Sequence, residues 1–408
     1  MNEIQLTITA LSPLAIGRQK PGGSISEAQT YIPGSVIRGA VAAQMLRQSP
    51  QCGDQPAGDF QALFIGEGAA IFSNAYPTVE GLRSQVLPAT ALSSKTAPGF
   101  RSEKASNAGV FDTLIDRFCA EGYGHLYDPT CPQGTDRVEP YGGFYSVEGT
   151  QYKSHAATTR LLTRVGINRR RATAQDKLLY SIEAISEKKQ SLYEQGKPWK
   201  PACFSSTIRL DDPELANLLQ RYLESNQWRL GGSASRGLGN VEIKATLMDY
   251  QPDVAHKVEK FNQAFQKRWN AWSIFGSPQS ALPQGHDFFT LDLQSDAVLT
   301  EAWRRTTVIS PAMLCRMVDL DDAELALHAA YSSYDYRSGW NAAWGLMKDV
   351  ELVTNPGSVY LFSTPKLDEW VLALQDLETT GVGDRTPEGF GQVRVCSEFH
   401  HVFREVAA

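Results

Sequence analysis

The sequence lacks any long apolar run. Its 408 residues contain no uninterrupted apolar stretch near the roughly 18–20 residues that a membrane-spanning helix needs. The first residues also lack the basic segment of a signal peptide, and their apolar residues alternate with polar ones. We therefore expect a protein that does not span a membrane and that begins with a β-strand.

Cysteine is scarce and widely spaced. The six cysteines do not form the dense framework of a disulfide-stabilised secreted domain, which favours reduced thiols and a cytoplasmic location. Cys119, His125 and Cys131 are weak candidates for a metal site, but they lack a close CxxC pair. A zinc site completed by Cys52 and free thiols in the core or in loops remain the two alternatives. The other three cysteines are Cys203, Cys315 and Cys396.

Positive charge is not in excess. The chain has 39 Lys and Arg residues against 45 Asp and Glu residues, a net charge of -6, whereas nucleic-acid-binding domains are usually basic. A net charge does not describe how charge is distributed, so this class stays open. Hydrophobic residues make up 42% of the chain, which excludes a disordered protein, and the length predicts two domains.

Catalytic signatures are missing as well. The sequence contains no Walker loop, no HExxH motif and no recognisable Ser/His/Asp arrangement. We expect no cofactor.

The two halves of the chain show a similar order of elements. Each half ends with an amphipathic helix, a glycine-rich loop and a strand, which indicates an internal repeat of one α+β unit. Residues 50–150 lack sustained periodicity and predict a loop-rich insertion, with a short helix at 110–119. Segment 294–350 predicts irregular and helical structure. The predicted strands are 3–10, 158–170, 203–210, 240–249, 287–293, 357–363 and 391–396, and the predicted helices are 35–47, 212–225 and 366–378.

The two glycine-rich loops span residues 230–240 and 381–391. Both run from a helix to a strand, the reverse of a dinucleotide-binding fingerprint. Exposed N–H groups in such loops can cradle phosphates, and Arg236 and Arg385 would add positive charge. The alternative for each loop is a tight turn with capping glycines.

An ordered set of short motifs resembles the RAMP superfamily of CRISPR-associated proteins. The segment Tyr31-Ile-Pro-Gly-Ser-Val-Ile-Arg-Gly39 and the first glycine-rich loop carry much of the resemblance. The further matching segments are 11–17, 164–169, 179–180, 339–345, 356–360 and 388–391. The combination is most similar to the two-module RAMP subunit of type III-D effectors.

This resemblance implies an α+β protein with two ferredoxin-like (RRM-like) domains, 1–250 with the insertion and 251–408. It also implies that the chain holds CRISPR RNA, often the 5′ repeat-derived handle. Its other partners would be target RNA in the assembled complex, other RAMP subunits and the large polymerase-like subunit. The residues expected to hold RNA are Arg18, Lys20, Ser35, Arg38, His155, Arg160, Arg164, Arg169, Arg170, Arg171, Ser233, Ser235, Arg236, Gly237, Arg385, Gly389, Phe390 and Gly391.

The distribution of charge agrees with RNA binding. Stretch 160–177 contains five arginines and Lys177 against Asp176 alone, and phosphate contacts by such residues supply much of RNA affinity. The alternative is a solvated hairpin edge. Ser35 and Arg38 begin the first predicted helix, where a phosphate or a simple N-cap both fit. Trp340 and Trp344 would share a helix face, as core or interface anchors or as base-stacking residues.

Cleavage of RNA has two weak candidate residues. RAMP subunits that cut target RNA usually carry an Asp between the first strand and the first helix, where this chain has Glu27 and no Asp. His155 is the other candidate for acid–base chemistry, with base contact and a structural role as alternatives. We expect a non-catalytic RNA-binding subunit. The competing hypotheses are an endoribonuclease and a protein-only scaffold whose glycine loops clamp partner chains.

Overall fold

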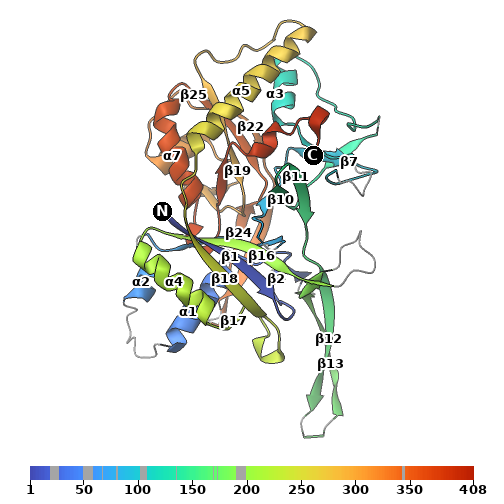
Figure 1. Cartoon of the computed structure of the whole chain (residues 1–408), viewed down its shortest axis with the longest axis vertical. Helices are drawn as coiled ribbons and strands as arrows, with labels where there is room; N and C mark the ends of the chain where they lie inside the picture. Colours follow the sequence, from blue (N-terminus) through green and yellow to red (C-terminus); the bar gives the residue numbers. More distant parts are fainter. Residues whose placement is uncertain are drawn as a thin grey trace.

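The computed structural model in Figure 1 places two antiparallel β-sheets and their helices in one molecule with a projecting hairpin. It describes residues 1–18, 27–48, 58–66, 68–79, 81–101, 108–134, 136–168, 170–171, 173–189, 199–341 and 345–408. Within these ranges, no helix is long and apolar enough to cross a membrane.

The first sheet has the order β17 (Trp228–Arg229), β18 (Asn240–Asp249), β1 (Asn2–Ala10), β16 (Cys203–Leu210) and β4 (Ile71–Phe72). β5 (Tyr76–Thr78) also pairs with β16. Alternate residues of β1, including Ile4, Leu6 and Ile8, are buried in a core shared with α1 (Gly34–Gln48) and α4 (Pro213–Ser225). α4 begins cleanly because Asp212 accepts hydrogen bonds from two backbone N–H groups of its first turn.

The second sheet has the order β22 (Ala326–Tyr331), β25 (Val359–Thr364), β19 (Asp287–Leu293) and β26 (Val393–Val395). Its core is rich in aromatic side chains. Phe289 stacks on Phe362 of β25 and on Trp370 of α7 (Leu367–Thr380), and Phe288 stacks on Phe265 of α5 (Val254–Trp272). α6 (Pro311–Val318) completes this unit with Met313 and Leu314 in the same core.

The two units repeat one topology. In chain order each has a strand, a helix, two strands, a helix and a strand, and the strands lie side by side in the order fourth, first, third, second. Each unit also inserts a long hairpin between its second and third strands. These hairpins are β12 (Thr159–Asn168) with β13 (Thr173–Ile185), and β23 (Tyr334–Asn341) with β24 (Leu346–Thr354).

A short hairpin follows the first strand of each unit. It consists of β2 (Gly17–Arg18) and β3 (Glu27–Ala28) in the first unit, and of β20 (Leu299–Glu301) and β21 (Arg304–Thr306) in the second. The expectation of only irregular and helical structure at 294–350 was therefore wrong. β23 and β24 expose much of their surface, so no core-facing alternation marks them in the sequence.

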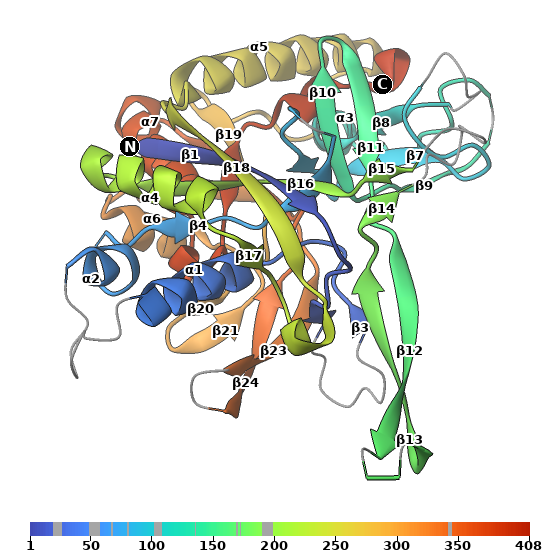
Figure 2. The ribbon, with the colours of Figure 1, turned by 60° about the horizontal axis from the view of Figure 1, so that its bottom comes forward.

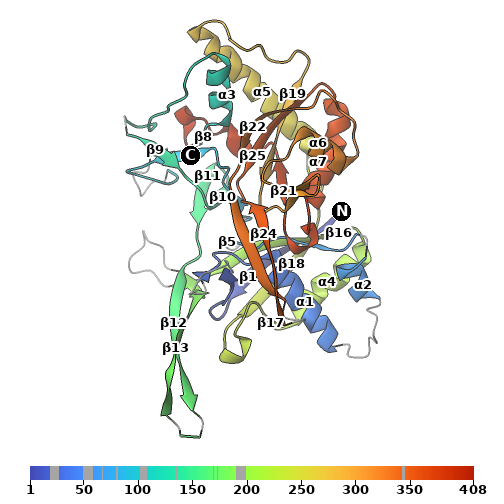
Figure 3. The same ribbon diagram turned by 180° about the vertical axis from the view of Figure 1, so that it is seen from behind.

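The insertion consists of short elements that bridge the two units (Figure 3). α3 (Leu114–Gly122) packs Leu114, Ile115 and Cys119 into the core of the second unit. The proposed division at residue 250 remains a prediction. The other elements of the insertion are α2 (Asp59–Phe64), β6 (Gln85–Val86), β7 (Ala91–Ser94), β8 (Val110–Asp112), β9 (Val138–Pro140) and β10 (Phe144–Glu148). The short strands β11 (Gln151–His155), β14 (Lys188–Lys189) and β15 (Lys200–Pro201) follow it in the chain.

Candidate nucleic-acid interface

The long hairpin β12–β13 and the first glycine-rich loop meet at one place. Figures 1 and 2 show the hairpin extending away from the body. At its root, Leu14 forms a β-bridge with Ile185, and the next residue, Ala15, forms one with Gly232 of the loop. The Arg236 guanidinium lies 5.2 Å from the centre of the Tyr180 ring on β13. The first loop and the hairpin therefore form one continuous surface.

The first loop depends on glycine for its shape. Gly231 and Gly239 have φ angles of 85° and 89°, and a Cβ at Gly231 would lie 2.6 Å from the carbonyl oxygen of Ala15. The middle of the loop is a single 3-10 turn, Ala234–Arg236, flanked by Ser233 and Gly237 in left-handed conformations. Ser235, Arg236 and Gly237 are exposed. The loop thus presents one arginine side chain to solvent, whereas the N–H groups of Arg236 and Gly237 donate to carbonyl oxygens inside the turn.

The second loop has the same backbone path. Leu230 and Val382 each donate an N–H bond of 2.8 Å to a glycine carbonyl, of Gly239 and Gly391 respectively. Gly232 donates its N–H to the carbonyl oxygen of Ala15, and Asp384 donates its N–H to that of Val298. Both acceptors lie just after the first strand of their unit. The internal repeat predicted from the sequence is therefore present in this detail.

The second loop nevertheless faces protein. Arg385 donates to Glu351 at 2.8 Å and to Glu388 at 2.7 Å, and it stacks on Phe390 at 4.7 Å. A Cβ on Gly389 would lie 2.6 Å from the carbonyl oxygen of Phe72 in the first sheet. The charge of this arginine is neutralised inside the molecule, and the tight-turn alternative describes this loop better.

The hairpin carries exposed basic and apolar side chains. Arg164 is exposed and lies opposite Tyr180 in the register, whereas Arg160 is bound to Glu187 at 2.7 Å. Arg170 and Arg171 are exposed near the tip, and Arg169 lies outside the described residues. Leu161 and Leu179 are 61% and 71% exposed, although leucine is usually buried. Such a surface offers both phosphate contacts and an apolar support for bases or for a protein.

The predicted phosphate site at the start of α1 is occupied by protein. The helix begins at Gly34, so Ser35 lies in its first turn and is not the N-cap. The N–H group of Gly34 donates to Asn74 at 2.8 Å, and a Cβ there would meet the carbonyl oxygens of Phe72 and Glu388. Arg38 donates to the carbonyl oxygen of Phe64.

The loop before α1 contributes one described arginine. Arg18 binds Asp335 of β23 at 2.7 Å and therefore joins the two units. Lys20 lies outside the described residues. Glu27 is exposed on β3, where its Cα is paired with that of Arg18.

His155 is a buried histidine. It is 7% exposed and lies 2.7 Å from the hydroxyl of Ser146. Burial lowers its pKa, and the nearby Lys189 and Lys153 lower it further, to about 4. The imidazole is therefore neutral at pH 7, and this geometry favours the structural alternative.

The weak metal candidates do not converge. Cys119 and Cys131 are buried, and His125 lies in ring contact with Phe275. Within the described residues no three His, Cys, Asp or Glu side chains form a group able to hold a metal ion. Trp340 lies on strand β23 rather than on a helix, and Trp344 is outside the described residues.

Two features escaped the sequence argument. Tyr180 was noted only as part of a motif, yet it supports Arg236. β14 and β15 bring lysines together that are 11 positions apart in the chain, Lys189 and Lys200. Neighbouring charges in the sequence would not have identified this pair, because the strand pairing creates it.

Comparisons with known proteins give a family and a set of distant structural neighbours. The sequence model of the RAMP superfamily matches residues 7–242. No curated protein matches. A cryo-EM structure of the type III-B Cmr-beta bound to cognate target RNA and AMPPnP is 11% identical, with 90% of this chain and 88% of that chain covered and a TM-score of 0.42. A structure of the type III-B Cmr-beta bound to cognate target RNA is 13% identical, with 88% of this chain and 86% of that chain covered and a TM-score of 0.42. The apo state of the type III-B Cmr-beta is 14% identical, with 60% of this chain and 97% of that chain covered and a TM-score of 0.31.

Proposed function

Because the chain belongs to the RAMP superfamily, we propose that it is a non-catalytic, CRISPR RNA-binding subunit of a type III effector ribonucleoprotein, of the III-D kind. One observation carries this proposal. In a chain with a net charge of -6, the first glycine-rich loop and the long hairpin form an exposed surface with arginines and an aromatic ring. Local positive charge of this kind attracts a polyanion regardless of the overall sign.

The topology supports two ferredoxin-like modules. The element order and the strand order of each unit are those of the β-α-β-β-α-β motif. Modules of this kind bind single-stranded RNA through sheet and loop surfaces.

The RNA would be held through its backbone and its unstacked bases. Arg164 and Arg236 would contact phosphates through their guanidinium groups. Tyr180 would support a base or the arginine that holds a phosphate. Exposed apolar side chains on both long hairpins suit contacts with neighbouring RAMP subunits, the polymerase-like subunit and the target RNA duplex. The five described cysteines are free thiols, which is consistent with a cytoplasmic location.

A salt titration of RNA binding tests the proposal. The double variant Arg164→Gln with Arg236→Gln should bind single-stranded RNA several-fold more weakly than the wild type. The slope of log affinity against log salt concentration should be smaller in magnitude by about 1.4, because two phosphate contacts are lost and each contributes roughly 0.7 to the slope. Arg221→Gln with Lys267→Gln, an equal loss of two positive charges at exposed positions of α4 and α5, is the matched control. A double variant with the affinity and slope of the control would overturn the assignment of this surface.

A further inference from the structure

A second positive surface lies at the root of the long hairpin. We call Lys188, Lys189 and Lys200 the lysine cluster. In the antiparallel pair β14–β15, Lys189 lies directly opposite Lys200, and Lys188 lies opposite Pro201. Like charges directly opposite each other in an antiparallel pair repel and destabilise the strands. The arrangement therefore has a cost unless an anion occupies the space beside the two ammonium groups.

Among the described residues, no carboxylate supplies that anion. Within the described residues, none of the three lysines forms an ion pair with a carboxylate. The Lys189 ammonium donates to the neutral carbonyl oxygen of Thr78 at 2.8 Å. Burial lowers the pKa of Lys189; of the two weaker influences, Cys203 raises the pKa and the positive charge of Lys200 lowers it. The carboxylate that comes just before the cluster, Glu187, is engaged by Arg160.

An exposed aromatic ring stands beside this uncompensated charge. Trp199 precedes Lys200 and is 57% exposed, although tryptophan is usually largely buried. A positive groove combined with a free aromatic face is the typical arrangement for single-stranded nucleic acid, because phosphates meet the cations and a base stacks on the ring. An acidic protein surface would satisfy the lysines but would leave the face of Trp199 without a specific role.

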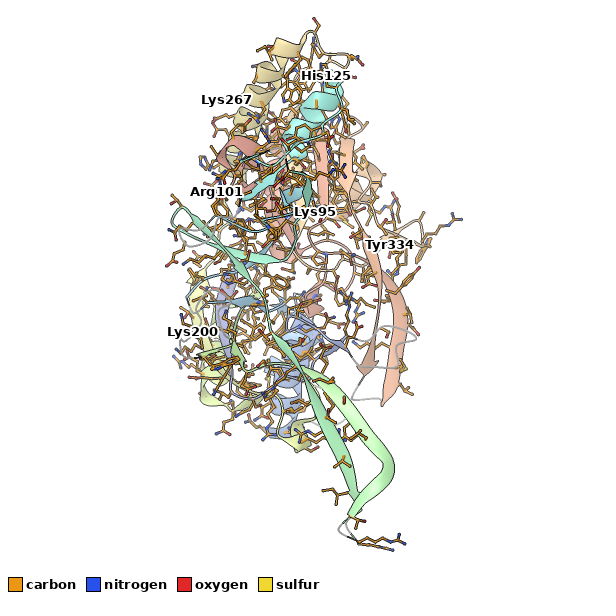
Figure 4. All side chains as sticks on the ribbon, turned by 90° about the vertical axis from the view of Figure 1, so that its right-hand side faces the viewer. Lys95, Arg101, His125, Lys200, Lys267 and Tyr334 are labelled. Atoms are coloured by element: carbon orange, nitrogen blue, oxygen red, sulfur yellow. The ribbon has the colours of Figure 1, made fainter. Side chains whose placement is uncertain are left out.

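The cluster continues the candidate interface. Its residues follow β13 directly, and Ala202 donates its N–H to the carbonyl oxygen of Glu187, so β14 and β15 stay at the hairpin root. Figure 2 shows β14 and β15 between β11 and the start of the projecting hairpin, and Figure 4 shows Lys200 at the edge of the body. An RNA strand that leaves the first glycine-rich loop would find further cations at this root.

We propose that the lysine cluster and Trp199 form a second contact site for single-stranded RNA, with phosphates on Lys188 and Lys200 and one unstacked base on the Trp199 ring. This inference rests on the proposed function and adds a site to it. Lys189 ties the strand pair to Thr78 of β5, whereas Lys188 and Lys200 are exposed to solvent.

Two variants of the full chain test the site with a fluorescent single-stranded RNA as the probe. Lys188→Gln with Lys200→Gln should weaken binding several-fold and make the salt dependence shallower by about 1.4. Trp199→Ala should weaken binding roughly five-fold or more. The slope of log affinity against log salt concentration should stay the same, because base stacking releases no counterions. The matched control for the double lysine variant is Lys267→Gln with Arg221→Gln, which also removes two exposed positive charges; Figure 4 shows Lys267 of α5 near the far end from the hairpin.

The outcomes separate this inference from the function on which it rests. If both variants bind RNA with the affinity of the control while the Arg164 and Arg236 double variant binds more weakly, the second site is overturned and the proposed function is not. A wild-type chain that binds polyglutamate but no RNA would overturn both proposals. Ultraviolet crosslinking of the RNA to a peptide containing Trp199, lost in Trp199→Ala, would support the site independently of affinity. Circular dichroism of each variant excludes unfolding as the cause of a loss.

Discussion

Among single residues, His400 is a buried titratable group between the insertion and the second sheet. It is fully buried, with Nε2 at 2.7 Å from an oxygen of Asp292 and Nδ1 at 3.3 Å from an oxygen of Asp112. Burial lowers its pKa, but the two carboxylates outweigh this effect and raise the pKa to about 10. The charged imidazolium therefore ties β8 of the insertion to β19 of the second sheet.

This histidine predicts a pH-dependent stability. Because the pKa of His400 is higher in the folded state than its usual 6.5, its contribution is complete below about pH 6.5 and is lost as the pH rises through about 10. His400→Gln should lower the free energy of unfolding at pH 6 by roughly 3 kcal/mol, because it leaves two buried carboxylates without a cation. Thermal unfolding of both proteins from pH 6 to pH 10 measures this. The difference between them should shrink with rising pH, and a constant difference would contradict the assignment.

Single arginines show why the candidate site could be predicted only in part. Arg236 and Arg385 carry the same signal in the sequence, an arginine in a glycine-rich loop between a helix and a strand. Only the structure separates them, because Glu351, which neutralises Arg385, lies 34 positions away in the chain. Arg18 and Arg38 likewise bind partners that local sequence does not indicate.

At the scale of elements, core-facing strands were predictable and exposed hairpins were not. The bounds of β16, β18 and β19 agree with the predictions, since their buried residues give a clear pattern. β23 and β24 lack such a pattern because, apart from Val353 and Thr354, their described side chains are exposed or half-buried. The strand predicted at 158–170 corresponds to β12, and the basic stretch at 160–177 overlaps this strand and the beginning of β13.

The two glycine-rich loops predict contrasting effects of one substitution. Gly391→Ala should destabilise the fold by more than about 2 kcal/mol, because φ is 64° and a Cβ would lie 1.8 Å from the carbonyl oxygen of Val382. Gly237→Ala places a Cβ in open space at a φ of 81° and should cost only about 1–2 kcal/mol. Urea unfolding measures both. Equal losses in the two variants would show that the second loop is not packed as described.

At the scale of the whole molecule, the net charge conceals separate surfaces. Acidic side chains neutralise many arginines internally, as Glu351 and Glu388 do for Arg385, while the first loop, the hairpin and the lysine cluster remain positive. The average charge is therefore a poor guide to partners. We expect the assembled complex to contain RNA along these surfaces.

The absence of catalysis is a prediction for the assembled complex. The complex incubated with target RNA should show no cut that depends on this chain, because His155 is buried and neutral and Glu27 has no acid–base partner among the described residues. The measurement is a cleavage assay with Glu27→Gln and, separately, His155→Gln. A cut that disappears in either variant, with RNA binding retained, would establish the endoribonuclease alternative.

The fixed root of the long hairpin has a mechanical consequence. Leu14 bridges to Ile185 and Ala15 bridges to Gly232, so one short segment is shared by the hairpin and the first glycine-rich loop. A force applied to the tip of the hairpin is therefore transmitted through this segment to the first glycine-rich loop. The second unit repeats this connection, since Ala297 bridges to Thr354 at the end of β24 and Val298 bridges to Asp384 of the second loop, but that loop is packed against Phe72 of the first sheet. Strain that a bound strand imposes on the β12–β13 hairpin is therefore transmitted to the loop that we expect to hold its phosphates.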